Sequence, residues 1–236
     1  MTAPSSGDGS PPMLRGSDGR EYPLNEFHLS LAGREWVLLH TGVILTHADE
    51  SRFFRELLKD LPYGVALWPS AIALAHELAA RGGDGFAGKT VLELGAGTGL
   101  PGIVAASQGA RRVVQTDRQE MAMAVCRRNA ERNGVHGIVH RLVDWTDWRD
   151  EARYDWILGS DILYGDGMHP HLRHIFRNNL GTDGRVLLAD PFRGPSLRLL
   201  ESLEQEGWAV AVTRWNLGGD GSDAPARPVG VFELRR

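Results

Sequence analysis

Three glycines and a glutamate within one short stretch indicate a site for an anionic ligand. Glu93 precedes the spacing Gly95-x-Gly97-x-Gly99, and the stretch follows an apolar run. Glycine lets a ligand approach the backbone closely, because it has no Cβ and tolerates positive φ. The residues that follow are expected to begin a helix, whose unpaired N–H groups favour a carboxylate or a phosphate. The pattern therefore predicts an anion-binding turn between a buried strand and a helix.

A second acidic side chain, Asp117, ends the next predicted strand, at 112–116. It lies 22 residues after Gly95 (117 − 95). A carboxylate at this distance can accept hydrogen bonds from both hydroxyls of a ribose, as in dinucleotide sites. The two features together favour a cofactor that contains a nucleoside. A tight strand–helix turn without a ligand and a domain for a nicotinamide cofactor are the alternatives that the pattern leaves open.

The stretch ELGAGTG at 93–99, taken with Asp117, resembles the first motif and the ribose-binding acid of the class I S-adenosylmethionine-dependent methyltransferases. The resemblance implies S-adenosyl-L-methionine as the cofactor. Gly95, Gly97 and Gly99 are then expected to hold its methionine end. Glu93 is expected inside the same site, either touching the cofactor or orienting a group that does.

Asp144 and Trp145 follow a predicted strand at 138–143. Ligands of open α/β sheets bind outside the carboxyl ends of the strands, so this pair is expected at the same rim as Asp117. The carboxylate can accept from the exocyclic amine of adenine, and the indole can cover a face of the ring. A turn residue beside a packed tryptophan is the alternative.

Two further segments narrow the resemblance to one branch, the seven-strand protein lysine methyltransferases. Trp68 lies in a stretch, 64–71, that looks like the tryptophan-bearing preamble of that branch, and Asp161-Ile162-Leu163-Tyr164 matches its D-x-x-Y motif. The resemblance spans roughly residues 60–215. It implies N-methylation of a protein lysine, with Trp68 at the cofactor and with Asp161 and Tyr164 as the catalytic residues. Asp190–Arg193 is expected at the same rim.

The chemistry of Asp161 and Tyr164 suits an amine. A lysine ammonium ordinarily has a pKa of about 10.4 and must lose a proton before its nitrogen can attack. Asp161 can accept and orient such a group, and Tyr164 can help to desolvate it. The same residues would suit a small-molecule amine such as nicotinamide. A small-molecule N- or O-methyltransferase and a cofactor-binding relative without catalysis therefore stay open.

The elements that must position these residues alternate between strands and helices from residue 90 to residue 206. The strands are expected at 90–94, 112–116, 138–143, 154–160 and 185–190. Such alternation predicts a parallel sheet that is covered on both faces. Trp208–Leu217 and Val229–Leu234 have no helix between them, which predicts an antiparallel pair at one edge. The methyltransferase resemblance implies a Rossmann-like, doubly wound α/β fold with seven strands in the order 3-2-1-4-5-7-6, the last strand being antiparallel. Before this core we expect a hairpin (26–31 and 35–40) and helices at 51–59 and 71–81.

Composition bounds the remaining possibilities. The chain has 236 residues, of which 42% are hydrophobic and 24% charged, and it carries a net charge of −4. These values predict one globular domain at 23–236 after a flexible, Gly/Ser/Pro-rich tail at 1–22. Nucleic acid is not expected as a partner, and no apolar run approaches the roughly 20 residues that span a bilayer. The single Cys126 favours a reducing compartment, and a cytoplasmic monomer is expected. His169-x-His171-x-x-His174 lacks a completing ligand, so no metal is expected.

Overall fold

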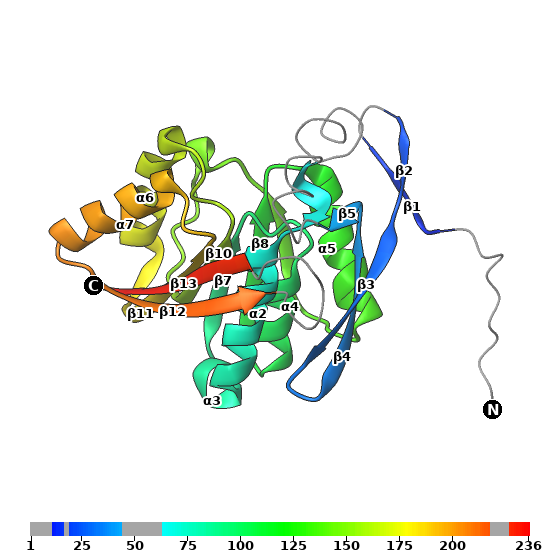
Figure 1. Cartoon of the computed structure of the whole chain (residues 1–236), viewed down its shortest axis with the longest axis horizontal. Coiled ribbons are helices and arrows are strands. Elements are labelled where there is room, and N and C mark those ends of the chain that lie inside the picture. The colour runs from blue at the N-terminus through cyan, green and yellow to red at the C-terminus, as the bar shows by residue number, and fades with distance from the viewer. Residues whose placement is uncertain (1–10, 17–18, 44–62, 218–226) are drawn as a thin grey trace.

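The computed structural model describes residues 11–16, 19–43, 63–217 and 227–236, and its centre is a seven-stranded sheet (Figure 1). The strand order is β12-β13-β11-β10-β7-β8-β9. Neighbouring strands are parallel except at β13, which runs antiparallel to both β11 and β12. Numbered along the chain from β7, this is the order 3-2-1-4-5-7-6, which confirms the predicted fold. The strand bounds are β7 Thr90–Leu94, β8 Arg112–Asp117, β9 Val139–Leu142, β10 Tyr154–Ser160, β11 Leu180–Asp190, β12 Ala209–Leu217 and β13 Arg227–Arg235.

Helices cover both faces of this sheet, because successive side chains of each strand point to opposite sides. Val91 of β7 packs in the cluster that contains the buried residues of α2 and α4, whereas its neighbour Leu92 packs in the cluster of α6 and α7. Both are fully buried. The helix bounds are α2 Pro69–Arg81, α3 Gly83–Phe86, α4 Leu100–Ser107, α5 Glu120–Arg132, α6 His169–Asn179 and α7 Gly194–Gln205.

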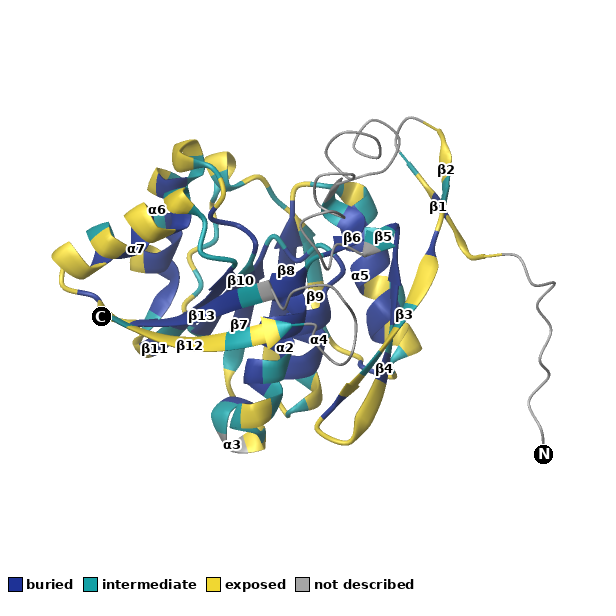
Figure 2. Cartoon of the chain, in the orientation of Figure 1, coloured by how far each residue is buried: buried dark blue, intermediate teal, exposed yellow. Residues whose placement is uncertain are grey.

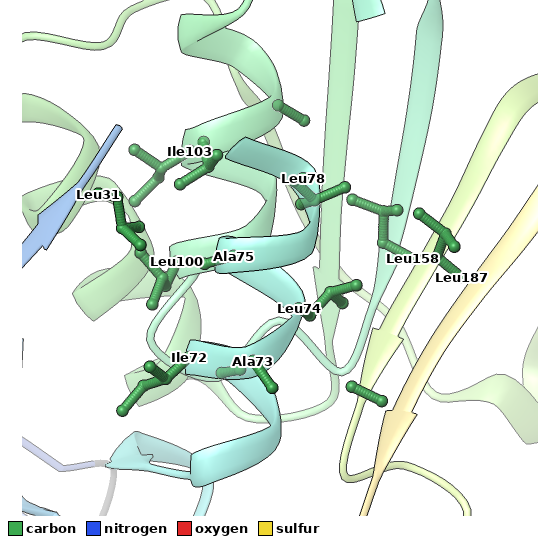
Figure 3. Packing of buried hydrophobic residues seen from close by; sticks show 14 of the residues in the cluster. Leu31, Ile72, Ala73, Leu74, Ala75, Leu78, Leu100, Ile103, Leu158 and Leu187 are labelled. Atoms are coloured by element: carbon green, nitrogen blue, oxygen red, sulfur yellow. The ribbon is translucent and has the colours of Figure 1, made fainter. Parts of the chain in front are cut away.

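The largest core lies between α2, α4 and the sheet. Leu74 and Leu78 lie on the side of α2 that faces Leu158 and Leu187 of the sheet (Figure 3). The sheet interior is dark in the burial view, while β12 at its edge is largely exposed (Figure 2). Burying a leucine of this kind is worth about 1.5–3 kcal/mol, so this packing holds α2 and α4 against the sheet.

The predicted N-terminal hairpin is confirmed. β3 (Asn25–Leu31) pairs antiparallel with β4 (Arg34–His40). The turn between them uses Ala32 and Gly33, both at positive φ (50° and 75°), which matches the right-handed twist of the flanking strands. Asn129 of α5 fastens the hairpin to the core, since its side chain accepts from Leu39 N at 2.7 Å and donates to Leu39 O at 3.1 Å.

Two short strands overlap the segment 1–22 that the sequence predicts to be a tail. β1 (Met13–Arg15) pairs antiparallel with β2 (Glu21–Pro23), and Leu14 is 2% exposed. Leu14 packs with Leu39, Val65 and Val125, so distant segments bury it. Composition reflects only the local segment, so a stretch rich in Gly, Ser and Pro gives no indication of packing against distant residues.

The remaining elements are short. A 3-10 turn, η2 (Tyr63–Val65), leads into β6 (Ala66–Leu67), which pairs in parallel with β5 (Gly42–Val43). The helix predicted at 51–59 lies outside the described residues. Among those that are described, no helix combines the length and the apolar character needed to cross a membrane.

Candidate functional site

A cleft opens at the carboxyl ends of β7, β8 and β10, where the chain order of the sheet reverses. It encloses about 720 Å³ of empty space, open solvent included. This position is the one that ligands occupy in open α/β sheets. Every predicted site residue except Glu93 and Gly99 lines it. The lining consists of Gly64, Trp68, Gly95, Gly97, Asp117, Arg118, Gln119, Val143, Asp144, Trp145, Ser160, Asp161, Ile162, Tyr164 and Met168.

Gly95 and Gly97 form the wall of the cleft with backbone alone. Their φ values are +63° and +55°, which L side chains rarely adopt. A Cβ on Gly95 would lie 2.8 Å from Ile162 Cγ2 and 3.4 Å from the Trp145 ring, and one on Gly97 would lie 3.2 Å from Gly64 O. A side chain at either position would therefore be strained and would crowd its neighbours, so the cleft wall needs glycine at both.

Gly99 faces the other way. It directly precedes α4 in the left-handed conformation (φ +80°), and a Cβ there would meet Cys126 Sγ and Gln115 Nε2, each at 2.9 Å. The third glycine of the motif is thus required for packing behind the glycine loop, the segment 95–99 between β7 and α4. It does not line the cleft, in contrast to the other two.

Glu93 also lies behind the loop. Its side chain is buried, and its Oε2 accepts from Gly102 N at 3.1 Å and from Gln115 Nε2 at 2.7 Å. Gln115 donates in addition to Gly99 O at 2.8 Å. Burial raises the pKa of Glu93 to about 8, although these hydrogen bonds oppose the shift. Glu93 therefore orients the first turn of α4.

Asp117 joins the glycine loop to the end of β8 at the floor of the cleft. One carboxylate oxygen accepts from Gly97 N at 3.1 Å, and the other accepts from Gln119 N at 2.9 Å. Burial raises the pKa of Asp117, whereas these backbone donors act in the opposite direction. Each carboxylate oxygen can accept more than one hydrogen bond, so Asp117 retains capacity for the hydroxyls of a ligand.

Asp144 and Trp145 form the far side of the cleft. Asp144 is exposed and caps the 3-10 turn η3 (Trp145–Asp147), since its Oδ1 accepts from Thr146 N at 2.9 Å and from Thr146 Oγ1 at 2.8 Å. These hydrogen bonds lower its pKa. Asp144 is thus a turn residue that also borders the cleft, and Trp145 packs partly against the core while its ring reaches Gly95.

Asp161 and Tyr164 differ in their surroundings. Asp161 directly follows β10, has a φ of +54°, and donates its backbone N–H to Ala189 O at 2.9 Å. Its carboxylate is buried and forms an ion pair with Arg193. Burial raises the pKa of Asp161, and Arg193 opposes that shift. Tyr164, by contrast, is 47% exposed at the rim.

One member of the histidine cluster, His169, contacts the loop that carries Tyr164. His169 is buried, with Nε2 at 3.1 Å from Leu163 O and Nδ1 at 3.6 Å from Asp166. Its contacts therefore support the segment that carries Tyr164. Among the described residues, no group of His, Cys, Asp and Glu side chains has a metal-binding arrangement.

Two side chains contribute to the site without a role that the sequence pattern predicts. Gln115 sits under the glycine loop, and a signal for it existed, since it is a polar residue inside the apolar strand β8. The sequence predicts Arg193 only as part of the rim segment 190–193. The pairing of Arg193 with Asp161 joins residues 32 positions apart, which no local pattern indicates.

Residues 48–196 match a family described as lysine methyltransferase. A protein N-lysine methyltransferase of Xenopus tropicalis, METTL21A, is 36% identical over 140 residues, which is 57% of this chain and 64% of that protein. A histone-arginine methyltransferase of Xenopus laevis, METTL23, is 40% identical over 108 residues, 43% of this chain and 45% of that protein. The chain thus spans less than two thirds of these curated relatives.

Solved structures show the same fold at low identity. A Thermus thermophilus 16S rRNA N2 G1207 methyltransferase, solved with AdoMet and guanosine, superimposes with a TM-score of 0.62 at 22% identity, covering 90% of this chain and 51% of that one. A ribosomal protein L11 methylase from Lactobacillus delbrueckii gives a TM-score of 0.55 at 20% identity, covering 84% and 95%.

Proposed function

The chain belongs to the lysine methyltransferase family, and from that premise we propose that it transfers a methyl group from S-adenosyl-L-methionine to the side-chain nitrogen of a protein lysine. The observation that carries the proposal is the cleft at the reversal point of the sheet. It brings the backbone-only wall of Gly95 and Gly97 together with two buried carboxylates, Asp117 and Asp161. One carboxylate suits a nucleoside, and the other suits an amine.

The residues of the cleft fit this cofactor. Gly95 and Gly97 expose backbone without side chains to the cleft, and α4 begins three residues after Gly97, so its first N–H groups favour a carboxylate. Asp117 would accept from the ribose hydroxyls, and Trp145 with Asp144 would hold the adenine. Trp68 lines the same cleft and would contact the cofactor. Bound there, S-adenosyl-L-methionine supplies an activated methyl group on a sulfonium.

The protein's own work in this reaction is positioning. A transfer between two bound groups gains most from holding them in line, because the loss of freedom has already occurred on binding. Asp161 would accept a hydrogen bond from the acceptor nitrogen and orient it. Tyr164 would shield that nitrogen from water, and its ring can stabilise an alkylated cation.

Replacing Asp161 with asparagine is expected to lower the rate of methyl transfer about 100-fold or more, because the acceptor loses its charged partner. The affinity for S-adenosylhomocysteine should change less than about threefold, since that ligand has no acceptor group to lose. Tritium transfer from labelled S-adenosyl-L-methionine to lysate proteins gives the rate, and calorimetry gives the affinity. Asp183→Asn is the matched control, because Asp183 is exposed near the start of β11 and does not line the cleft. An equal loss of rate and affinity would make Asp161 a cofactor or structural residue.

Calorimetric titration with S-adenosylhomocysteine tests the proposal directly, with NAD as the control ligand. Micromolar binding of the first alone supports it, and binding of NAD alone would point to a dehydrogenase. Mass spectrometry of the labelled lysate then identifies the acceptor. Methyl-lysine supports the proposed substrate, whereas methyl-arginine or label confined to small molecules would contradict it. A cytoplasmic location and a monomeric state stay predictions of the sequence.

A further inference from the structure

Three charged side chains meet beside the cleft, where β10 and β11 end. Arg193 donates through Nη1 to Asp161 Oδ1 and, at 3.1 Å, to Asp190 Oδ2. Its backbone N–H donates to Asp190 Oδ1 at 2.7 Å. The side chains of Asp161 and Asp190 are 5% and 0% exposed, and that of Arg193 is 24% exposed. One guanidinium thus faces two buried carboxylates, of which only Asp161 lines the cleft.

Arg193 donates a hydrogen bond to three of the four oxygens of these two carboxylates. The remaining atom, Asp161 Oδ2, is buried and has no hydrogen-bond partner among the described residues. The Ser70 hydroxyl at the start of α2 lies beside this carboxylate and favours its charged form, although no hydrogen bond of standard geometry joins the two side chains. A buried acceptor without a partner is costly, so a donor from a ligand would be stabilising there.

The backbone around this cluster is strained. Asp161 and Phe192 are two of the three non-glycine residues with positive φ in the described part of the chain, at 54° and 61°. Such conformations cost of order 1–3 kcal/mol each and persist only where surrounding contacts enforce them. The ion pair of Arg193 with Asp161, together with the two bonds from Arg193 to Asp190, provides that enforcement across the two strand ends.

We propose that Arg193 is a positioning residue of the acceptor site, whose guanidinium fixes Asp161 and leaves a single carboxylate oxygen for the nitrogen that receives the methyl group. The inference rests on the proposed function and adds a determinant of its specificity. A guanidinium binds a carboxylate best through two parallel N–H bonds, and here one oxygen is already taken. An amine needs only one acceptor, so the cluster favours an amine over a guanidinium.

Electrostatics agree with this geometry. Burial raises the pKa of Asp161, Arg193 lowers it, and Asp190 raises it, while Ser70 contributes an uncharged hydroxyl from α2. Without Arg193, the Asp161 carboxyl would hold its proton to a higher pH. It would then present a hydroxyl donor and keep only the weaker acceptor capacity of a neutral carboxyl, so it would hold the amine less well.

The test is a carboxyl-carbon NMR titration of Asp161, assigned by its loss in Asp161→Asn, with and without saturating S-adenosylhomocysteine. Arg193→Gln should move the Asp161 midpoint upward by about 1–3 pH units, as expected for the loss of an adjacent opposite charge. Arg193→Lys should give a smaller upward shift. Arg177→Gln is the matched control, because Arg177 pairs with Glu206 away from the cleft, and it should leave the midpoint unchanged.

An unchanged midpoint in folded Arg193→Gln would overturn the proposal. If that variant does not fold, Arg193→Lys decides, and the absence of any shift overturns it. Specificity is read in the wild-type protein, where n-butylammonium should perturb the Asp161 signal at lower concentration than n-butylguanidinium; the reverse order also overturns it. The titration without S-adenosylhomocysteine does not depend on cofactor binding. It can therefore support or overturn the role of Arg193 even if the proposed methyltransferase function is wrong.

Discussion

Replacing Asp117 with alanine is expected to weaken the binding of S-adenosylhomocysteine by roughly 10- to 150-fold. A hydrogen bond to a charged acceptor contributes about 1.5–3 kcal/mol, and each 1.4 kcal/mol is tenfold in affinity. Asp117 is only 8% exposed, at the floor of the cleft. In the alanine variant, water is therefore a poor substitute for the missing carboxylate. The same carboxylate holds Gly97 N and Gln119 N, and its removal also frees the glycine loop.

Calorimetry at neutral pH measures this loss, and thermal unfolding of the free variant separates binding from folding. Asp117→Asn should lie between the wild type and alanine, because both oxygens of Asp117 accept from backbone N–H groups and an amide nitrogen would oppose one of them. Asp147→Ala is the matched control, since Asp147 is exposed and pairs with Arg149 at the surface. Unchanged affinity in Asp117→Ala would place the ribose elsewhere.

The architecture could be predicted from the sequence because it depends on local periodicity and on element order. β10 begins and ends at the predicted residues, Tyr154 and Ser160. The antiparallel edge followed from the absence of a helix between the last two strands. β11, however, begins at Leu180, five residues before the predicted start at Arg185, because Leu180 pairs with Tyr154 before an irregularity in the register.

The site was predicted less completely, because a motif gives residue types and not the direction in which each side chain points. Glu93 and Gly99 belong to the same stretch as Gly95 and Gly97, yet they pack against Gln115 and Cys126 behind the loop. Their orientation depends on how β7 pairs with β8, which brings Glu93 opposite Gln115. Asp161 was predicted for its carboxylate, but its partner Arg193 comes from the adjacent strand end and needed the three-dimensional structure.

Glu93 makes the stability of this protein depend on pH in a direction unusual for a carboxylate. Its pKa rises from 4.5 to about 8 on folding, because burial penalises the charged form. Between these values the folded state binds more protons than the unfolded state, so stability is greatest below pH 4.5 for this group and is lost as the pH rises through 8. This loss of stability is at most about 5 kcal/mol, because each unit of pKa shift corresponds to about 1.4 kcal/mol. Burial also raises the pKa of Asp117, which acts with the same sign.

Glu93→Gln should therefore flatten the stability profile between pH 5 and pH 9 and should unfold at higher denaturant concentration than the wild type at pH 9. Both hydrogen bonds of Glu93 reach one oxygen, Oε2, so a glutamine can keep them through its amide oxygen while its uncharged head avoids the desolvation cost. Urea unfolding of the free protein across this range gives the profile. Glu204→Gln removes an exposed charge from α7 and should leave it as in the wild type. Parallel curves for Glu93→Gln and the wild type would mean that Glu93 keeps its ordinary pKa, and the hydrogen bonds from Gly102 and Gln115 would then stabilise the carboxylate as strongly as burial opposes it.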